Sequence, residues 1–244
     1  MTILEQYFEK SAERYWSPLR GLTGRDAAVY PLLAELGGPN CALLEYGFGS
    51  GSLLFPLAKE PRFSSVFGVE ISQKQIERCR AELENIGEAW CKKVKFLAPE
   101  DDRLPGIADE SIDVILCFAT IELVLDPFIL LDEFFRIGAP DAQLVCSFGN
   151  LAYLKHRIRL MAGRLPQLGT GEPVSNWRAA GWDGMRLHNF TKRSFTVLLN
   201  DCGWKPVSWS GRGDRFPGFR VLRTKFPSLF SGELIVTCSK RRVR

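Results

Sequence analysis

The chain has 244 residues, of which 45% are hydrophobic and 25% charged, the balance of an ordinary globular protein with a substantial core. Its net charge of +4 does not indicate a nucleic-acid-binding protein, and no apolar run reaches the roughly 18 residues of a membrane-spanning helix. The seven cysteines form no CxxC pair, which argues against a zinc site. We expect them to be buried, reduced thiols in a cytoplasmic protein.

The first forty residues read as helical. Apolar residues at helical spacing predict one helix that includes Tyr15 and a second over 27–36, which Gly37 and Gly38 end. Short apolar runs then alternate with helical patterns, so that strands are expected at 41–46, 65–71, 94–98, 111–119 and 142–148, with helices at 52–59, 73–85 and 127–135. Ser72 is a suitable cap for the helix 73–85. This alternation requires crossover connections and predicts a parallel sheet covered on both faces.

After Asn150 the alternation stops. The sequence predicts an amphipathic basic helix at 153–166, a glycine- and tryptophan-containing loop at 169–189, and a helix at 191–203 capped by Thr191. Strands are expected at 204–210 and 233–240, with an arginine-rich loop between them. The expected fold is therefore α/β and doubly wound, with a mostly parallel, Rossmann-like sheet of seven strands, N-terminal helices and an inserted helical lid. We divide the chain into an N-terminal cover (1–40), an α/β core (41–149), a lid (150–190) and the rest of the core (191–244).

A glycine-rich loop follows the first strand. Gly47, Gly49 and Gly51 lie on alternate positions, and since glycine loses much backbone entropy on folding, so close a group needs a reason. A dinucleotide fingerprint, GxGxxG, would have its third glycine at position 52, which is Ser52. The loop alone leaves three interpretations open: a dinucleotide site, a site for another nucleotide-like ligand, and a simple turn.

With Glu45 in front, the loop reads acid-x-Gly-x-Gly-x-Gly and resembles the first motif of the class I S-adenosylmethionine-dependent methyltransferases. The resemblance implies S-adenosylmethionine as cofactor, with its methionine portion and sugar over Gly47, Gly49 and Gly51. Glu45 would reach the ammonium group directly or through water. Phe48 is bulky for this loop, and we expect it to stack on the cofactor, to displace the loop, or to fill space.

Two further motifs extend the resemblance. Glu70 ends the second strand, where a carboxylate can accept hydrogen bonds from both ribose hydroxyls, and Ile71 beside it joins the expected cofactor site. Asp101 lies four residues before Pro105, at the position where the family binds the adenine amino group, and Asp102 is the next candidate. A solvated acidic turn is the other interpretation of these residues.

The fourth strand completes the resemblance, which covers about 41–148. Phe118 and Ala119 leave its tip beside the expected adenosine site, and Ile121–Glu122 and Asp126–Pro127 match the pairs that follow in the family. Leu123 replaces a histidine that is common there, which excludes a base at this position. Tyr15 could close over the cofactor, although a packing role is equally expected.

The resemblance implies methyl transfer to a small molecule, and we expect an oxygen acceptor such as the hydroxyl of a sugar, glycan precursor, quinone or natural product. The sequence CFATIE stands where enzymes acting on nucleobase amines or protein glutamine have Asn/Asp-Pro-Pro-Tyr, so nucleic acid is disfavoured. His188, in the lid, is the first candidate for a base or substrate contact and Glu122 the second. No metal is expected. The basic stretch KHRIRLMAGR suggests an anionic or lipid-linked substrate, and it leaves open a non-catalytic protein that binds RNA or a membrane surface.

Overall fold

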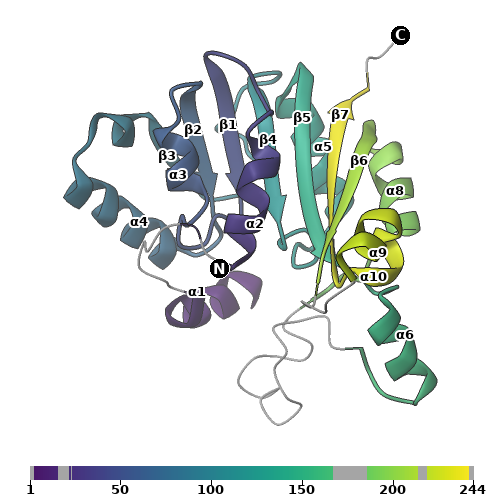
Figure 1. The fold of residues 1–244 in the computed structure, drawn as a ribbon. Helices are drawn as coiled ribbons and strands as arrows, with labels where there is room; N and C mark the ends of the chain where they lie inside the picture. The colour runs from purple at the N-terminus through teal and green to yellow at the C-terminus, as the bar shows by residue number, and fades with distance from the viewer. Residues whose placement is uncertain (1–2, 16–21, 23, 167–185, 214–218, 242–244) are drawn as a thin grey trace. The chain divides into compact units, whose positions relative to one another are not determined.

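A computed structural model describes residues 3–15, 22, 24–166, 186–213 and 219–241 (Figure 1). The described chain contains one seven-stranded sheet of order β3-β2-β1-β4-β5-β7-β6. The strands are β1 (Cys41–Tyr46), β2 (Phe63–Val69), β3 (Val94–Leu97), β4 (Ile112–Phe118), β5 (Gly138–Gly149), β6 (Trp204–Arg212) and β7 (Glu233–Lys240). The pairs β1–β2 and β2–β3 are parallel and β6–β7 is antiparallel, so the expected doubly wound, mostly parallel Rossmann-like fold is confirmed.

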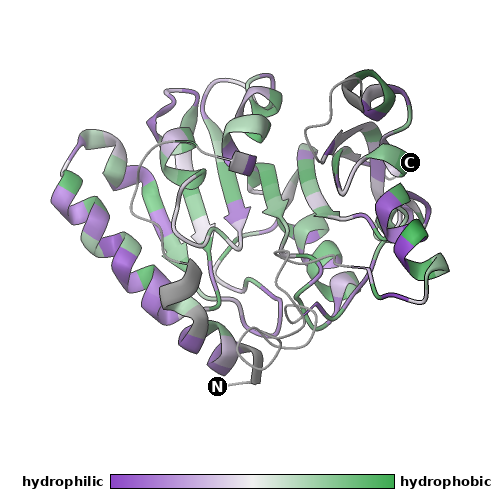
Figure 2. Cartoon of the chain, turned by 60° about the horizontal axis from the view of Figure 1, so that its bottom comes forward, coloured by the Kyte–Doolittle hydropathy of each residue, from purple (hydrophilic) through white to green (hydrophobic). Residues whose placement is uncertain are grey.

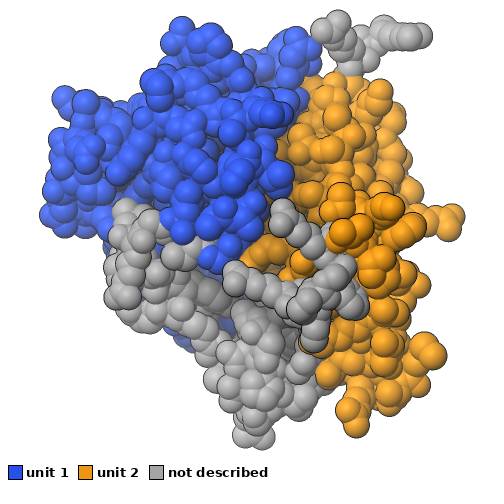
Figure 3. All heavy atoms as spheres, in the orientation of Figure 1, with its two compact units in different colours: residues 1–116, 136–143 blue, residues 117–135, 144–244 orange. Residues whose placement is uncertain are grey.

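The chain divides into two compact units, each described by itself below. Unit 1 comprises residues 1–116 and 136–143, and unit 2 comprises residues 117–135 and 144–244 (Figure 3). The four-part division expected from the sequence stays a prediction. Most of the predicted lid lies outside the described residues, which leave out 167–185.

In unit 1, apolar strands form the centre and amphipathic helices surround them. The helices are α1 (Ile3–Tyr15), α2 (Gly24–Leu33), α3 (Leu54–Lys59), α4 (Gln73–Ile86) and the 3₁₀ helix η1 (Ala89–Lys93). Figure 2 shows the strands mostly in green, whereas α4 alternates between purple and green, as expected of a helix with one buried face. The Ser72 side chain accepts a hydrogen bond from the Gln75 amide, which confirms the expected cap of α4.

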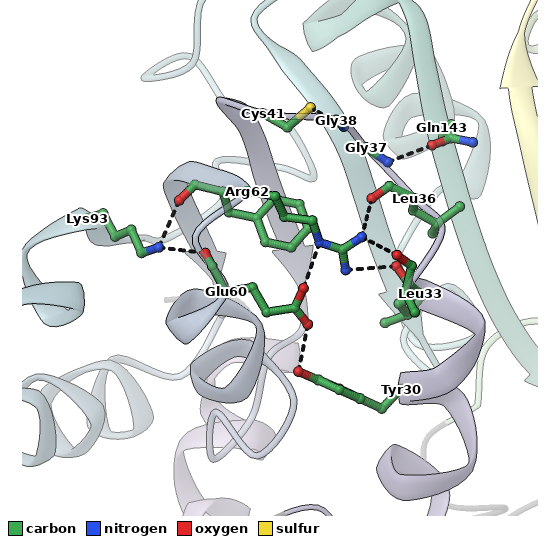
Figure 4. A network of polar contacts seen from close by, with 12 residues as sticks. Tyr30, Leu33, Leu36, Gly37, Gly38, Cys41, Glu60, Arg62, Lys93 and Gln143 are labelled. Carbon is green, nitrogen blue, oxygen red and sulfur yellow. Dashed lines mark hydrogen bonds and ion pairs between the residues drawn. The ribbon is translucent and has the colours of Figure 1, made fainter.

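A polar network fixes the end of α2 to the connection between α3 and β2 (Figure 4). The Arg62 guanidinium donates at 2.9 Å to the carbonyl of Leu33, which the end of α2 leaves without a partner in the helix, and at 2.7 Å to the carbonyl of Leu36 just beyond it. Arg62 also forms an ion pair with Glu60 at 2.7 Å, which in turn accepts a hydrogen bond from Tyr30 at 2.6 Å. Burial, followed by this bond to Glu60, raises the pKa of Tyr30 to about 12. The network positions α2, whose first turn lies at the candidate site described below.

Unit 2 contains the antiparallel end of the sheet. Trp204 is fully buried at the start of β6, and its indole N–H donates to the Leu131 carbonyl at 3.1 Å. The expected cap at Thr191 is present as a capping box with Ser194. The helices are α5 (Pro127–Ile137, which continues into unit 1), α6 (Leu154–Met161), α8 (Lys192–Asp201), α9 (Phe219–Lys225) and α10 (Pro227–Phe230).

Two expectations about local structure are wrong. The arginine-rich segment before β7 was expected to be a loop, but it contains α9 and α10, and Pro227 opens α10 at a position where proline needs no amide hydrogen. The fifth strand was expected at 142–148 but begins at Gly138. The sequence did not predict a strand at 138–141 because it contains Pro140 and Asp141, and both residue types are depleted in strands.

Candidate active site

The glycine loop follows β1 directly, in unit 1. Gly47, Gly49 and Gly51 have φ values of 76°, 57° and 75°, all in the left-handed region that favours glycine. A Cβ atom at Gly49 would meet nothing within 4 Å, so its backbone conformation, rather than crowding, selects glycine there. The Gly47 amide donates to the Val69 carbonyl at 2.8 Å, which ties the loop to the end of β2. The loop lies where the strand order reverses between β2 and β4, the place where open α/β sheets bind ligands.

The ring of Phe48 points into the core of unit 1. It is buried, and its centroid lies 5.1 Å from that of Phe96. Gly68 makes room for it, since a Cβ atom at Gly68 would lie 2.9 Å from Phe48 Cδ1. Of the three expectations for Phe48, this arrangement favours the space-filling one. Contact of Phe48 with a cofactor stays a prediction. Because the ring is buried, such a contact would be made by the backbone atoms of Phe48.

Glu45 is a buried carboxylate with an unsatisfied oxygen. It is 4% exposed, and its Oε2 finds no hydrogen-bond partner in the described part of the chain. Burial raises the pKa of Glu45 to about 8, with a further increase from Asp26 that Arg25 partly opposes. Buried polar atoms are nearly always hydrogen-bonded, so a donor outside the described residues would suit this oxygen, and a cationic donor would suit it best.

Asp26 and Arg25, in the first turn of α2, also belong to this cluster. Ser52, in the residues after the glycine loop, donates a short hydrogen bond to Asp26, and Arg25 lies 3.4 Å from the other carboxylate oxygen of Asp26. Sequence reasoning missed both residues. An aspartate in the first turn of a helix is ordinary, because it complements the helix dipole, so the sequence carried no signal that it lies near Glu45.

Glu70 lies at the carboxyl end of β2, as expected, and binds the glycine loop. Its Oε2 accepts a hydrogen bond from the Gly49 amide at 3.0 Å, and its Oε1 accepts from the amides of Ile71 and Ser72 at 2.9 and 3.2 Å. Burial raises the pKa of Glu70, while these amides oppose the rise. A carboxylate has about four acceptor positions and three amides donate here, so Glu70 retains capacity for about one ligand hydroxyl.

Helix α1 is anchored beside Glu70. The Glu9 carboxylate accepts hydrogen bonds from the Ser72 hydroxyl at 2.8 Å and from the Lys74 amide at 3.2 Å, at the positive N-terminal end of α4. Tyr15 is the last residue of α1, and its side chain lies outside the described part of the chain. Its role at the cofactor stays a prediction.

Asp101 and Asp102 form the tip of a tight turn. Their φ values are 49° and 62°, and the flanking residues Glu100 and Arg103 exchange two backbone hydrogen bonds of 2.9 Å. Asp102 accepts a hydrogen bond of 2.8 Å from the hydroxyl of Tyr46, the residue directly before the glycine loop, whereas Asp101 is exposed. The turn is thus tied to the loop through Asp102, although position in the motif had favoured Asp101. The adenine contact stays a prediction for either residue.

In unit 2, a second buried carboxylate organises the backbone. Glu122 is 1% exposed and accepts short hydrogen bonds from Arg186 and from the Gly149 amide. Its own carbonyl accepts from the amides of Leu187 and His188 at 2.9 and 3.1 Å. Burial raises the pKa of Glu122, and Arg186 is the largest opposing influence. Glu122 therefore holds the start of the segment 186–190 in place.

His188 approaches two backbone carbonyls. Its Nε2 lies 3.0 Å from the Val124 oxygen and 3.2 Å from the Leu125 oxygen. Carbonyl oxygens only accept hydrogen bonds, so Nε2 carries the proton and Nδ1 is the basic nitrogen of the neutral ring. The other histidine, His156, is buried and its ring packs against that of Tyr153.

Phe118 is the last residue of β4 and Ala119 follows it, both in unit 2. Phe118 is buried, and the Ala119 amide donates to the Ser147 carbonyl at 3.1 Å with a left-handed φ of 52°. Among the described residues, no cluster of histidine, cysteine or acidic residues could hold a metal ion. No described helix has both the length and the apolar character needed to cross a membrane.

Comparison with known proteins identifies a domain and a fold. Residues 44–146 match a family model described as a methyltransferase domain. A search of curated proteins finds no match.

Solved structures match nearly the whole chain. An S-adenosylmethionine-dependent methyltransferase from Aquifex aeolicus is 14% identical, with 95% of this chain and 98% of that chain covered and a TM-score of 0.62. A possible histamine N-methyltransferase from Thermotoga maritima is 19% identical, covering 98% and 100%, with a TM-score of 0.62. The geranyl diphosphate C-methyltransferase of Streptomyces coelicolor A3(2), solved with S-adenosyl-L-homocysteine, is 15% identical, covering 90% and 77%, with a TM-score of 0.60. At these identities the likeness is one of fold.

Proposed function

We propose that this chain transfers a methyl group from S-adenosylmethionine to a small molecule. Residues 44–146 match a methyltransferase domain, and the chain has the class I S-adenosylmethionine-dependent methyltransferase fold, which implies that cofactor. The single observation that carries the proposal is the buried Oε2 of Glu45, which lacks a hydrogen-bond partner in the described chain. The ammonium group of the cofactor has the charge and the donors that this oxygen needs.

The residues of unit 1 fit this cofactor. Glu45 would bind the ammonium group, and Glu70, already oriented by three backbone amides, would accept a hydrogen bond from a ribose hydroxyl. Asp102, which Tyr46 orients, or the exposed Asp101 would bind the adenine amino group. The other proposed cofactor contacts are Gly47, Phe48, Gly49, Gly51, Ile71, Phe118, Ala119 and Tyr15.

The chemistry asks little of the protein beyond binding. The cofactor, when bound, supplies an electrophilic methyl group, so the residues of the chain need to orient the reactants and exclude water. A hydroxyl acceptor would also need a base. We assign this role to Nδ1 of His188, with Glu122 as the second candidate, because Nε2 of His188 is held as a donor by two carbonyls.

We propose an oxygen of a small molecule as the acceptor, in a sugar, glycan precursor, quinone or natural-product hydroxyl. The sequence CFATIE at 117–122 supports this choice, since it lacks the Asn/Asp-Pro-Pro-Tyr motif of enzymes that methylate planar amide or amine nitrogens. The basic residues of α6 favour anionic or lipid-linked compounds among these. A cytoplasmic location stays a prediction.

Isothermal titration of the chain with S-adenosylmethionine tests the proposal. The native chain should bind, and Glu70→Gln should weaken binding at least tenfold, because a neutral amide accepts less strongly from hydroxyls. Glu77→Gln, an exposed position on α4, is the matched control and should bind as the native chain does. Absence of binding by the native chain would overturn the proposal. Binding without methyl transfer to any nucleophile would favour the non-catalytic alternative, as would salt-dependent RNA binding.

A further inference from the structure

Helix α6 of unit 2 presents its apolar side chains outward. Met161 is 88% exposed and Ile158 is 57% exposed, and Leu160 and Leu165 are also exposed. The only buried residue of the helix is His156, the reverse of the usual arrangement in which the apolar face is covered. Figure 1 shows α6 next to α9 and α10, at the margin of unit 2.

Three apolar residues form a stripe along α6. Ile158 and Met161, both exposed, and the half-buried Leu154 are separated by three and four positions, so they lie on the same face of the helix. His156, two positions from both Leu154 and Ile158, lies on the opposite face. Its Nδ1 contacts the Asn150 carbonyl at 3.1 Å, and the Asn150 amide group donates to the carbonyls of Ser228 and Ser231 at 2.8 Å. The base of α6 is therefore fixed, and the stripe has a defined orientation.

Cations flank the stripe. Lys155 and Arg157 lie on either side of it and are exposed, and Arg159 and Arg164 add two further positive charges. There is no acidic residue between 151 and 166. An aliphatic stripe bordered by lysine and arginine is the arrangement of helices that lie in a membrane interface, where apolar side chains enter the lipid and the cations bind headgroups.

We infer that α6 docks the protein on an anionic lipid surface, with Leu154, Ile158 and Met161 toward the acyl chains. The charge of the helix fits the negative headgroups of such a surface, and the exposed apolar area adds an attraction that salt does not screen. The inference rests on α6 alone and holds whether or not the chain transfers methyl groups.

Two other occupants fit less well. Single-stranded RNA is bound by aromatic side chains on which bases stack, whereas the exposed stripe is aliphatic and Tyr153 is buried. A second copy of the chain packed on the same face would bring Lys155 and Arg157 against their own copies, and such like-charge contacts disfavour a two-fold interface.

Co-sedimentation of the full chain with lipid vesicles tests the inference. We expect binding to vesicles of phosphatidylcholine mixed with phosphatidylglycerol and little binding to phosphatidylcholine alone. Ile158→Glu combined with Met161→Glu should reduce the partition coefficient at least tenfold, since both carboxylates would face anionic lipid. Lys155→Gln combined with Arg157→Gln should reduce it about 25-fold at low salt, at roughly fivefold per charge.

Val197→Glu is the matched control, because Val197 is a 55% exposed apolar residue on α8 of the same unit. It should bind vesicles as the native chain does, and circular dichroism should show all variants folded. Equal binding of the native chain and the Ile158→Glu/Met161→Glu variant would overturn the inference. So would equal binding to neutral vesicles, RNA binding that the same variant abolishes, or a dimer that depends on Met161.

Discussion

Two buried carboxylates, Glu45 in unit 1 and Glu122 in unit 2, are used in opposite ways. Both are almost fully covered, and burial raises the pKa of both. Glu122 accepts hydrogen bonds from Arg186 and the Gly149 amide. Glu45 has one oxygen with no hydrogen-bond partner among the described residues, and its strongest charged neighbour, Asp26, repels it.

The difference indicates a structural role for Glu122 and is consistent with the proposed ligand-binding role of Glu45. A buried acid that accepts from a cation and a backbone amide stabilises one arrangement of the backbone, and removing the cation leaves a buried charge. A buried acid with an oxygen that lacks a partner destabilises the ligand-free chain, and under the proposed function the cofactor would supply that partner. Substitutions around Glu122 should therefore change stability, and substitutions around Glu45 should change affinity for the cofactor.

The largest effect is expected for Arg186→Met. This change leaves Glu122 buried without its cation, and we expect the free energy of unfolding to fall by about 3 kcal/mol in urea titrations. The double variant Glu122→Gln/Arg186→Met should recover part of this loss, because no charge remains buried. Arg212→Met is the control. Its ion pair with Glu233, at 3.1 Å, is partly exposed, and its loss should change stability by less than about 1 kcal/mol. Equal losses for the two arginines would remove the distinction drawn for Glu122.

Glu45→Gln should do the reverse. We expect it to weaken S-adenosylmethionine binding by about 2 to 3 kcal/mol, or roughly 30- to 150-fold, because the cofactor ammonium loses a buried anionic partner. The stability of the ligand-free chain should be unchanged below pH 4.5 and higher near neutral pH, since the folded variant no longer holds a proton that the unfolded chain releases. Titration calorimetry and urea unfolding measure the two quantities. A variant that loses stability but keeps its affinity would make Glu45 a structural residue like Glu122.

Stability should also depend on pH through Glu45. Its pKa is about 8 in the folded chain against an ordinary value of 4.5, so between these values the folded chain holds a proton that the unfolded chain has released. The contribution of Glu45 to the free energy of unfolding is therefore fully present below pH 4.5 and is lost as the pH rises to about 8. Over this range the free energy of unfolding falls by at most about 1.4 kcal/mol per pH unit.

Unfolding at a series of pH values measures this slope, and Glu45→Gln should flatten it. Glu70 and Glu122, whose pKa values burial also raises, act in the same direction and leave a residual slope in the variant. Curves that run parallel for the native chain and the variant would show that Glu45 does not titrate in this range.

The positions of the acids in unit 1 could be predicted from the sequence. Glu45 and Glu70 follow from their places at the ends of successive apolar strands, because parallel strands bring their carboxyl ends to one edge of the sheet. The mostly parallel sheet follows from the same alternation of strands and helices, even though β5 begins earlier than expected. Local pattern was sufficient to place these two acids at the ends of strands.

The rest depends on contacts between distant residues. Arg186 and Glu122 are 64 positions apart, and nothing in either segment marks them as partners. The direction of the Phe48 ring depends on the space left by Gly68. Asp26 reaches Ser52 from α2, whose other end is bound by Arg62, 36 positions further along the chain. Such pairings depend on tertiary packing, which periodicity and motif spacing do not predict.

The smallest effect is expected for Asp26→Asn, and it gives the most specific information about Glu45. Asp26 raises the pKa of Glu45 through its charge, so the neutral amide should shift the pH midpoint of cofactor binding downward, by less than about one unit. Calorimetric titrations between about pH 6 and 9 measure the midpoint. Asparagine can still accept the hydrogen bond from Ser52, whereas Ser52→Ala removes that bond and keeps the charge. If charge is the cause, only Asp26→Asn moves the midpoint. An equal shift in Ser52→Ala would instead trace the raised pKa to the packing of the loop around Glu45.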